Sequence, residues 1–111
     1  MSYREKEFKT ILVSFEDPNI GILQMNRPKA FNAVNEQLLD EAYEALIAMQ
    51  EDPEVKVIIV CGNENAFAAG ADLRAVAGYN AFEARNFLDK VHRTVFAMED
   101  NHKPIVAAVN G

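Results

Sequence analysis

Cysteine, serine and histidine are scarce in this chain, which argues against several kinds of site. The single cysteine, Cys61, leaves no intrachain disulfide and suits a reducing compartment. Because Cys61 ends an apolar run, we interpret it as a packing thiol. The serines, Ser2 and Ser14, do not lie on a turn that would expose a nucleophile. The histidines, His92 and His102, lack metal-ligand spacing, so we expect no metal site.

The chain also lacks a long apolar run and an excess of positive charge. No run approaches the roughly 20 residues of a membrane-spanning helix, and the charged residues 1–7 show no secretory signal. A formal net charge of -6 argues against nucleic acid or an anionic membrane as the main partner. The glycines form neither a dinucleotide fingerprint nor a P-loop. We therefore expect a cytoplasmic protein without a nucleotide cofactor.

The residues of the first half predict a β-hairpin followed by a helix. Phe8–Phe15 and Ile20–Met25 are rich in β-branched and aromatic residues, and turn-forming residues separate them. From Asn35 onward the apolar residues recur at helical spacing, and Asn35 is suited to cap that helix. The helix is expected to end near Pro53.

The second half predicts two more strands with a helix between them. The continuous apolar run Val55–Cys61 is typical of a strand covered on both faces. A helix is expected over Ala81–Met98, burying Phe82, Phe87, Leu88, Val91, Val95 and Met98. The apolar run 105–109 predicts the last strand. This order predicts an α/β fold with a parallel sheet, and no linker divides residues 1–111 into domains.

The segment 65–73 (Asn-Ala-Phe-Ala-Ala-Gly-Ala-Asp-Leu) is the most informative stretch of the chain. It follows a predicted strand and consists mostly of residues with little side chain, so a ligand can approach its backbone. Asp72 and Leu73 are typical of a helix start, where amides lack intrahelical partners and can hold an oxyanion. The same segment is equally typical of a surface turn that ends in an aspartate N-cap.

Three stretches, taken in order, resemble the crotonase family, also called the enoyl-CoA hydratase/isomerase superfamily. Residues 22–33 resemble its strand and CoA-contacting loop, and residues 66–73 resemble its oxyanion and adenine-binding loop. Residues 103–111 resemble the strand that leads to its glycine-rich second oxyanion segment. The resemblance implies a crotonase-like (ClpP/crotonase) fold, of which residues 1–111 would be the N-terminal portion, a partial domain that looks like a fragment.

The resemblance also assigns roles to individual residues. The backbone N–H of Ala71 matches the first oxyanion donor, which polarises the thioester carbonyl. Lys29 and Ala30 match a loop that meets the CoA, although Lys29 is equally well interpreted as a solvated lysine in a turn. The remaining positions that match the CoA path are Ala69, Gly70, Asp72 and Leu73. CoA would enter as part of an acyl-CoA substrate, so no separate cofactor and no metal are expected.

The resemblance implies that the family's other catalytic groups do not fall within residues 1–111. In the hydratases, two glutamates handle the water and the proton, and a glycine supplies the second oxyanion amide. All three lie after the region that matches Asn110 and Gly111, and Glu64 and Asp72 are not expected to replace them.

The resemblance therefore implies a full-length enoyl-CoA hydratase that acts on 2-enoyl-CoA in fatty-acid β-oxidation and forms a homo-oligomer, a trimer or a dimer of trimers. This chain alone is expected to be inactive. A double-bond isomerase, a dehalogenase or a ring-forming synthase of the same family stays open. So do a non-catalytic module that binds acyl-CoA or protein, and a fragment that is unstable alone.

Overall fold

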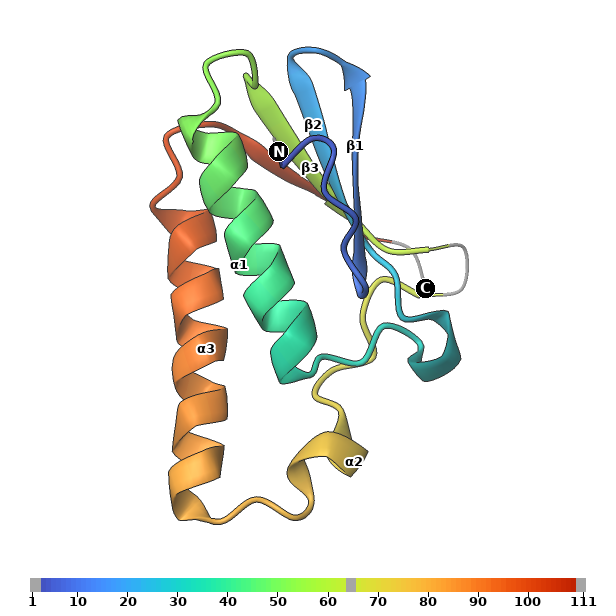
Figure 1. Cartoon of the computed structure of the whole chain (residues 1–111), viewed down its shortest axis with the longest axis vertical. Helices are drawn as coiled ribbons and strands as arrows, with labels where there is room; N and C mark the ends of the chain where they lie inside the picture. Colours follow the sequence, from blue (N-terminus) through green and yellow to red (C-terminus); the bar gives the residue numbers. More distant parts are fainter. Residues whose placement is uncertain (1–2, 64–65, 110–111) are drawn as a thin grey trace.

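The computed structural model describes residues 3–63 and 66–109, which form a mixed sheet with the strand order β1-β2-β3-β4 (Figure 1). β1 (Ile11–Asp17) and β2 (Ile20–Met25) form the predicted antiparallel hairpin. β3 (Val57–Cys61) is parallel to β2, and β4 (Ile105–Ala108) is parallel to β3. The hairpin followed by crossover units is therefore confirmed.

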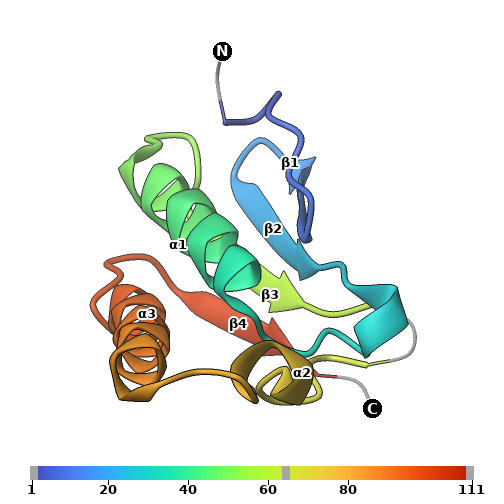
Figure 2. The same cartoon turned by 60° about the horizontal axis from the view of Figure 1, so that its bottom comes forward.

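Two long helices lie side by side on one face of the sheet (Figures 1 and 2). They are α1 (Glu36–Glu51) and α3 (Ala81–Glu99). The predicted cap of α1 is confirmed, because Asn35 Oδ1 accepts a hydrogen bond from the Leu38 N–H at 2.9 Å. The loops after β2 and β3 contain two short helices, η1 (Pro28–Ala30) and α2 (Leu73–Val76).

The core lies between α1 and one face of the sheet. Ile58 and Val60 of β3 are buried there, whereas Val57, Ile59 and Cys61 point to the other face and are only half-buried. The prediction that β3 is covered on both faces is therefore wrong for the described part of the chain, because α1 and α3 share one face. Cys61 is partly covered, and this burial raises the pKa of its thiol.

The bounds predicted for α3 agree with the structure to within one residue at its C-terminal end. Its predicted burial is confirmed for Phe87 and partly for Val91 and Met98, which are half-buried, but it is wrong for the other three residues. Phe87 is buried, whereas Phe82 is 74% exposed, and Leu88 and Val95 are also exposed. The reason is that α3 packs mainly against α1 rather than on the sheet. Its apolar side chains instead line a cavity between the helix and the sheet.

Candidate functional site

Two loops lie next to each other beyond the carboxyl ends of β2 and β3 (Figure 1). Residues 26–35 follow β2, and residues 62–72 follow β3. An isolated parallel bridge between Val34 and Ala71 joins them. Ligands of parallel sheets bind beyond the carboxyl ends of the strands, so the two loops lie where a site is expected.

The main chain at Ala71 runs alongside Val34. The Val34 N–H donates to the Gly70 carbonyl oxygen at 2.7 Å, and the Asp72 N–H donates to the Val34 carbonyl oxygen at 2.8 Å. The residue between these two groups directs its own N–H to the opposite side. No acceptor for the Ala71 N–H is found within residues 3–63 and 66–109. Within this part of the chain, internal pairing therefore does not consume the donor, and its oxyanion role stays a prediction.

Asp72 caps α2 and is held by a cation. Its Oδ1 accepts hydrogen bonds from the N–H groups of Arg74 at 3.1 Å and Ala75 at 3.3 Å. The expectation that the first amides of this helix are free donors is therefore wrong for these two, because the cap consumes them. The Arg27 guanidinium donates to Asp72 Oδ2 at 3.0 Å, and this bond holds the pKa of the Asp72 carboxyl below its ordinary value.

A polar cavity of about 490 Å³ lies between the two loops, lined by Arg27, Lys29, Ala30, Ala33, Asp72, Leu73 and Arg74. It brings together four of the residues expected to contact CoA, while Ala69 is exposed and does not line it. In the described part of the chain, no ion-pair or hydrogen-bond partner is found for the side chains of Lys29 and Arg74. Both cations are therefore able to bind an anion such as a phosphate.

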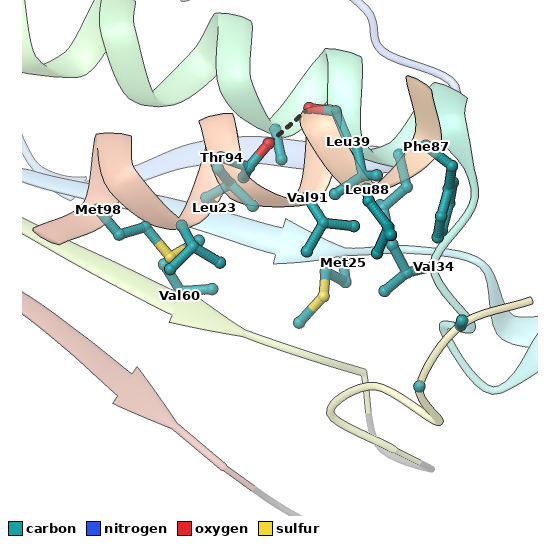
Figure 3. Close-up of a pocket in the computed structure, with 15 residues that line it drawn as sticks. Leu23, Met25, Val34, Leu39, Val60, Phe87, Leu88, Val91, Thr94 and Met98 are labelled. Atoms are coloured by element: carbon teal, nitrogen blue, oxygen red, sulfur yellow. Dashed lines mark hydrogen bonds between the residues drawn. The ribbon is translucent and has the colours of Figure 1, made fainter. Parts of the chain in front are cut away.

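An apolar cavity of about 430 Å³ lies between the sheet, α1 and α3 (Figure 3). Gly70 and Ala71 line one part of it, and Thr94 contributes a hydroxyl that already donates to the Lys90 carbonyl oxygen at 2.9 Å. The other lining side chains are apolar: Leu23, Met25, Val34, Leu38, Leu39, Ala42, Val60, Phe87, Leu88, Val91, Val95 and Met98. Ala71 thus lines the apolar cavity, and the next residue, Asp72, lines the polar cavity.

Three site residues were not singled out from the sequence. Arg27 and Arg74 line the polar cavity, and their positive charge beside the predicted loops is a signal that could have found them. Asn32 is fully buried between the loops, and its side chain bonds to the main chain at Arg27, Ala66 and Phe67. No local pattern in the sequence indicates contacts that reach so far along the chain.

The described residues that line the polar and apolar cavities offer few groups for acid–base catalysis. Among the described lining residues of the two cavities, Asp72 is the sole carboxylate, and it is paired with Arg27. The described residues also contain no cluster of His, Cys, Asp and Glu that could hold a metal. No helix in the described part of the chain is both long and apolar enough to span a bilayer. Ser2, Glu64, Asn65, Asn110 and Gly111 lie outside the described residues.

The sequence model of the Enoyl-CoA hydratase/isomerase family matches residues 16–111. The chain belongs to this family. It is 40% identical over 108 residues to the Crotonyl-CoA hydratase of Syntrophomonas wolfei, a match that covers 94% of this chain and 40% of that protein. It is 38% identical over 92 residues to the mitochondrial Enoyl-CoA hydratase of Pongo abelii, covering 83% of this chain and 31% of that protein.

Solved structures agree with the family assignment. The crystal structure of the Enoyl-CoA Hydratase from Bacillus anthracis superposes with a TM-score of 0.88 at 32% identity, covering 93% of this chain and 40% of that chain. An enoyl-CoA hydratase/isomerase from Xanthobacter autotrophicus superposes with a TM-score of 0.87 at 32% identity, covering 95% and 40%. The family member described here therefore has the crotonase-like fold, and it spans 40% or less of the curated relatives named above.

Proposed function

We propose that this chain is the thioester-binding portion of an enoyl-CoA hydratase that adds water to 2-enoyl-CoA in fatty-acid β-oxidation. In that reaction the oxygen of water bonds to C3, a proton is added at C2, and the double bond between them is lost. The electrons pass through an enolate-like intermediate, in which the thioester oxygen gains negative charge. A donor aimed at that oxygen accelerates the reaction because it binds the intermediate more strongly than the substrate.

The observation that supports this proposal most is the Ala71 N–H, for which the described residues offer no acceptor, in a residue that lines the apolar cavity and precedes Asp72 of the polar cavity. The thioester oxygen would accept a hydrogen bond from this N–H. The phosphates of CoA would lie in the polar cavity near Lys29 and Arg74, and the acyl chain would enter the apolar cavity. One substrate would thus account for the polar cavity, the apolar cavity and the donor at Ala71.

The same proposal leaves the proton chemistry to other parts of a longer parent. A general acid or base must lie within hydrogen-bond reach of the reacting atoms. Asp72 is unsuited to that work, because its carboxylate already caps α2 and pairs with Arg27. In the parent, two glutamates and a second amide donor would complete the site, and the parent would act in the cytoplasm as a homo-oligomer. The 111-residue chain would bind thioesters without converting them.

Calorimetry with the purified chain tests this proposal. We expect crotonyl-CoA to bind more tightly than free CoA, and we expect the enoyl absorbance to stay constant during incubation. Hydration of crotonyl-CoA by this chain would contradict the assignment of the acid and base to other segments. Failure to bind any acyl-CoA would contradict the proposed site itself.

A second candidate is a non-catalytic acyl-CoA-binding module. This candidate is favoured because Asp72 is the sole carboxylate among the described residues that line the apolar and polar cavities. Its pairing with Arg27 leaves no free general acid or base there. The two candidates differ in the longer parent, because only the hydratase would convert crotonyl-CoA to 3-hydroxybutyryl-CoA. An isomerase would instead convert a 3-enoyl-CoA to the 2-enoyl isomer, which the same assay distinguishes.

A further inference from the structure

The loop that carries the Ala71 N–H has little packing to hold it. Ala68, Ala69, Gly70 and Ala71 are all exposed. Gly70 has a φ of +99°, and a methyl group added there would meet no atom within 4 Å. Exposed small residues with a glycine among them have low barriers to motion. The Val34 N–H holds the Gly70 carbonyl oxygen of the peptide unit that carries the Ala71 N–H. The direction of the Ala71 N–H therefore depends on this bond and on the contacts that position the chain on either side of residues 68–71.

On the N-terminal side, that contact is made by Asn32. Its Nδ2 donates to the carbonyl oxygens of Ala66 at 3.0 Å and Phe67 at 3.1 Å. Its Oδ1 accepts from the Arg27 N–H at 2.6 Å and from Asn63 Nδ2 at 3.4 Å. All the hydrogen-bonding capacity of the amide is thus used, in a side chain with 0% exposure.

On the C-terminal side, the ion pair between Arg27 and Asp72 holds the chain. Arg27 also donates from its guanidinium to the Ala33 carbonyl oxygen. The N–H of Arg27 bonds to Asn32 while its side chain bonds to Asp72, so one residue joins the two contacts. The exposed residues 68–71 lie between these contacts.

From this geometry we propose that Asn32 is a positioning residue that directs the Ala71 N–H toward the thioester. A primary amide is needed at this position because it carries two donor hydrogens and an acceptor oxygen together. A carboxylate of the same shape would place negative charge against the carbonyl oxygens of Ala66 and Phe67. Asn32 also has a φ of 58°, a left-handed conformation that asparagine tolerates better than most residues.

The proposal that the N–H meets a thioester rests on the proposed function, but the positioning itself can be tested without ligand. Backbone NMR relaxation on the chain should give an order parameter of about 0.85 at Ala71 in the wild type, and below about 0.6 in Asn32→Asp. The sheet and α1 should keep their wild-type values. Asn86→Asp makes the same chemical change at an exposed position of α3 and should leave residues 68–71 unchanged.

A second variant covers the case in which Asn32→Asp does not fold. Asn32→Gly accepts the left-handed conformation and removes the amide, so it should loosen the same residues. A rigid Ala71 in either folded variant would overturn the proposal. Global unfolding of both variants would also overturn it, because the effect is confined to the loop.

Ligand binding then tests the link to the thioester. With a ¹³C-labelled enoyl-CoA, the infrared carbonyl stretch should shift to lower frequency on the wild type and return toward its solution value on Asn32→Asp. The affinity for crotonyl-CoA should fall by about tenfold and that for free CoA by less than about twofold. An unchanged carbonyl shift in the variant would overturn the role. If the wild type binds no thioester, the proposed function fails, while the relaxation data still decide whether Asn32 positions the loop.

Discussion

Lys103 Nζ lies 2.5 Å from the carbonyl oxygen of Met49, at the C-terminal end of α1. The same ammonium donates to the Asp52 carbonyl oxygen at 2.6 Å. These bonds join the segment before β4 to α1 and place a positive charge at the negative end of the helix dipole. Burial lowers the pKa of the Lys103 ammonium.

Lys103→Met is expected to lower the free energy of unfolding by about 1–2 kcal/mol, because two carbonyl oxygens lose a charged donor. Chemical denaturation measures the difference. Lys56→Met is the matched control, since the Lys56 ammonium donates to the Pro53 carbonyl oxygen at 3.1 Å in an exposed position. Its effect should stay below about 0.5 kcal/mol. Equal losses of unfolding free energy in the two variants would show that the contacts of Lys103 stabilise the fold no more than the exposed contact of Lys56.

Three glycines between β3 and α3 provide a graded test of this segment. A methyl group at Gly62 would lie 2.1 Å from the Ala66 carbonyl oxygen and 2.5 Å from Phe67 Cα. We expect Gly62→Ala to destabilise the chain by about 3 kcal/mol or more. Gly70→Ala should cost about 1–2 kcal/mol through its positive φ. Gly78→Ala meets neither obstacle and should be neutral or slightly stabilising.

Thermal melting of the three variants would give this order directly. A Gly62→Ala variant as stable as Gly78→Ala would contradict the close approach between Gly62 and residues 66–67. The comparison of Gly62→Ala with Gly70→Ala also distinguishes a steric clash from an unfavourable backbone conformation, because Gly70 has open space around it.

Asp72→Asn should destabilise the chain at neutral pH but not in acid. The folded-state pKa of Asp72 lies below its unfolded value, so the unfolded chain binds more protons in acid. The stabilisation is fully present above about pH 4 and is lost as pH falls through the folded-state pKa. Asparagine keeps the cap of α2 but loses the charge that pairs with Arg27.

Urea denaturation across this pH range measures the difference between wild type and Asp72→Asn. Asp89→Asn serves as the control, because Asp89 faces Arg85 in an exposed pair on α3. A difference that stays constant from neutral to acid pH would show that the Arg27–Asp72 pair is not the source of the stabilisation.

Lys29→Gln tests the polar cavity that Lys29 lines. The variant should bind CoA about threefold to tenfold more weakly, because a point charge near a phosphate is removed. Its affinity should also respond less to added salt. Lys56→Gln removes the same charge at the opposite end of β3 and should leave CoA binding unchanged. Identical salt dependence in the wild type and Lys29→Gln would place the phosphates elsewhere.

Val91→Phe tests the apolar cavity, which Val91 lines from α3 (Figure 3). A larger ring should take space from a long acyl chain and leave a short one undisturbed. We expect affinity for a 2-octenoyl thioester to fall by about tenfold and affinity for crotonyl-CoA to change by less than about twofold. As the control, Ala84→Phe adds a ring at an exposed position of the same helix that does not line the cavity. Equal losses for both thioesters would exclude this cavity as the acyl site.

The regular elements could be predicted from the sequence because their signals are local. The helical spacing after Asn35 and the cap at that residue gave α1 with the correct start. Continuous apolar runs gave β3 and β4 to within two residues at each end. The bounds of α3 were also predicted, but of the residues predicted to be buried only Phe87 is fully buried. Periodicity specifies which face of a helix is apolar and does not specify what packs against it.

The arrangement of the loops could not be predicted, because it depends on distant contacts. Phe31 and Asn32 adopt consecutive left-handed conformations that local preference disfavours, particularly at Phe31. The bridge between Val34 and Ala71 likewise has no counterpart in a local pattern. Family resemblance indicated the two segments, and the structure shows that Arg27 and Asn32 join them.

The pairing of Val34 with Ala71 connects segments that meet only after the hairpin, α1 and β3 have assembled. Under the proposed function, a partly folded chain would therefore offer no oriented amide, and a thioester would bind only to the folded chain. Ligand binding and folding would then be coupled, because a conformer that loses this bridge would not bind the ligand. We therefore expect saturating acyl-CoA to raise the melting temperature of the chain.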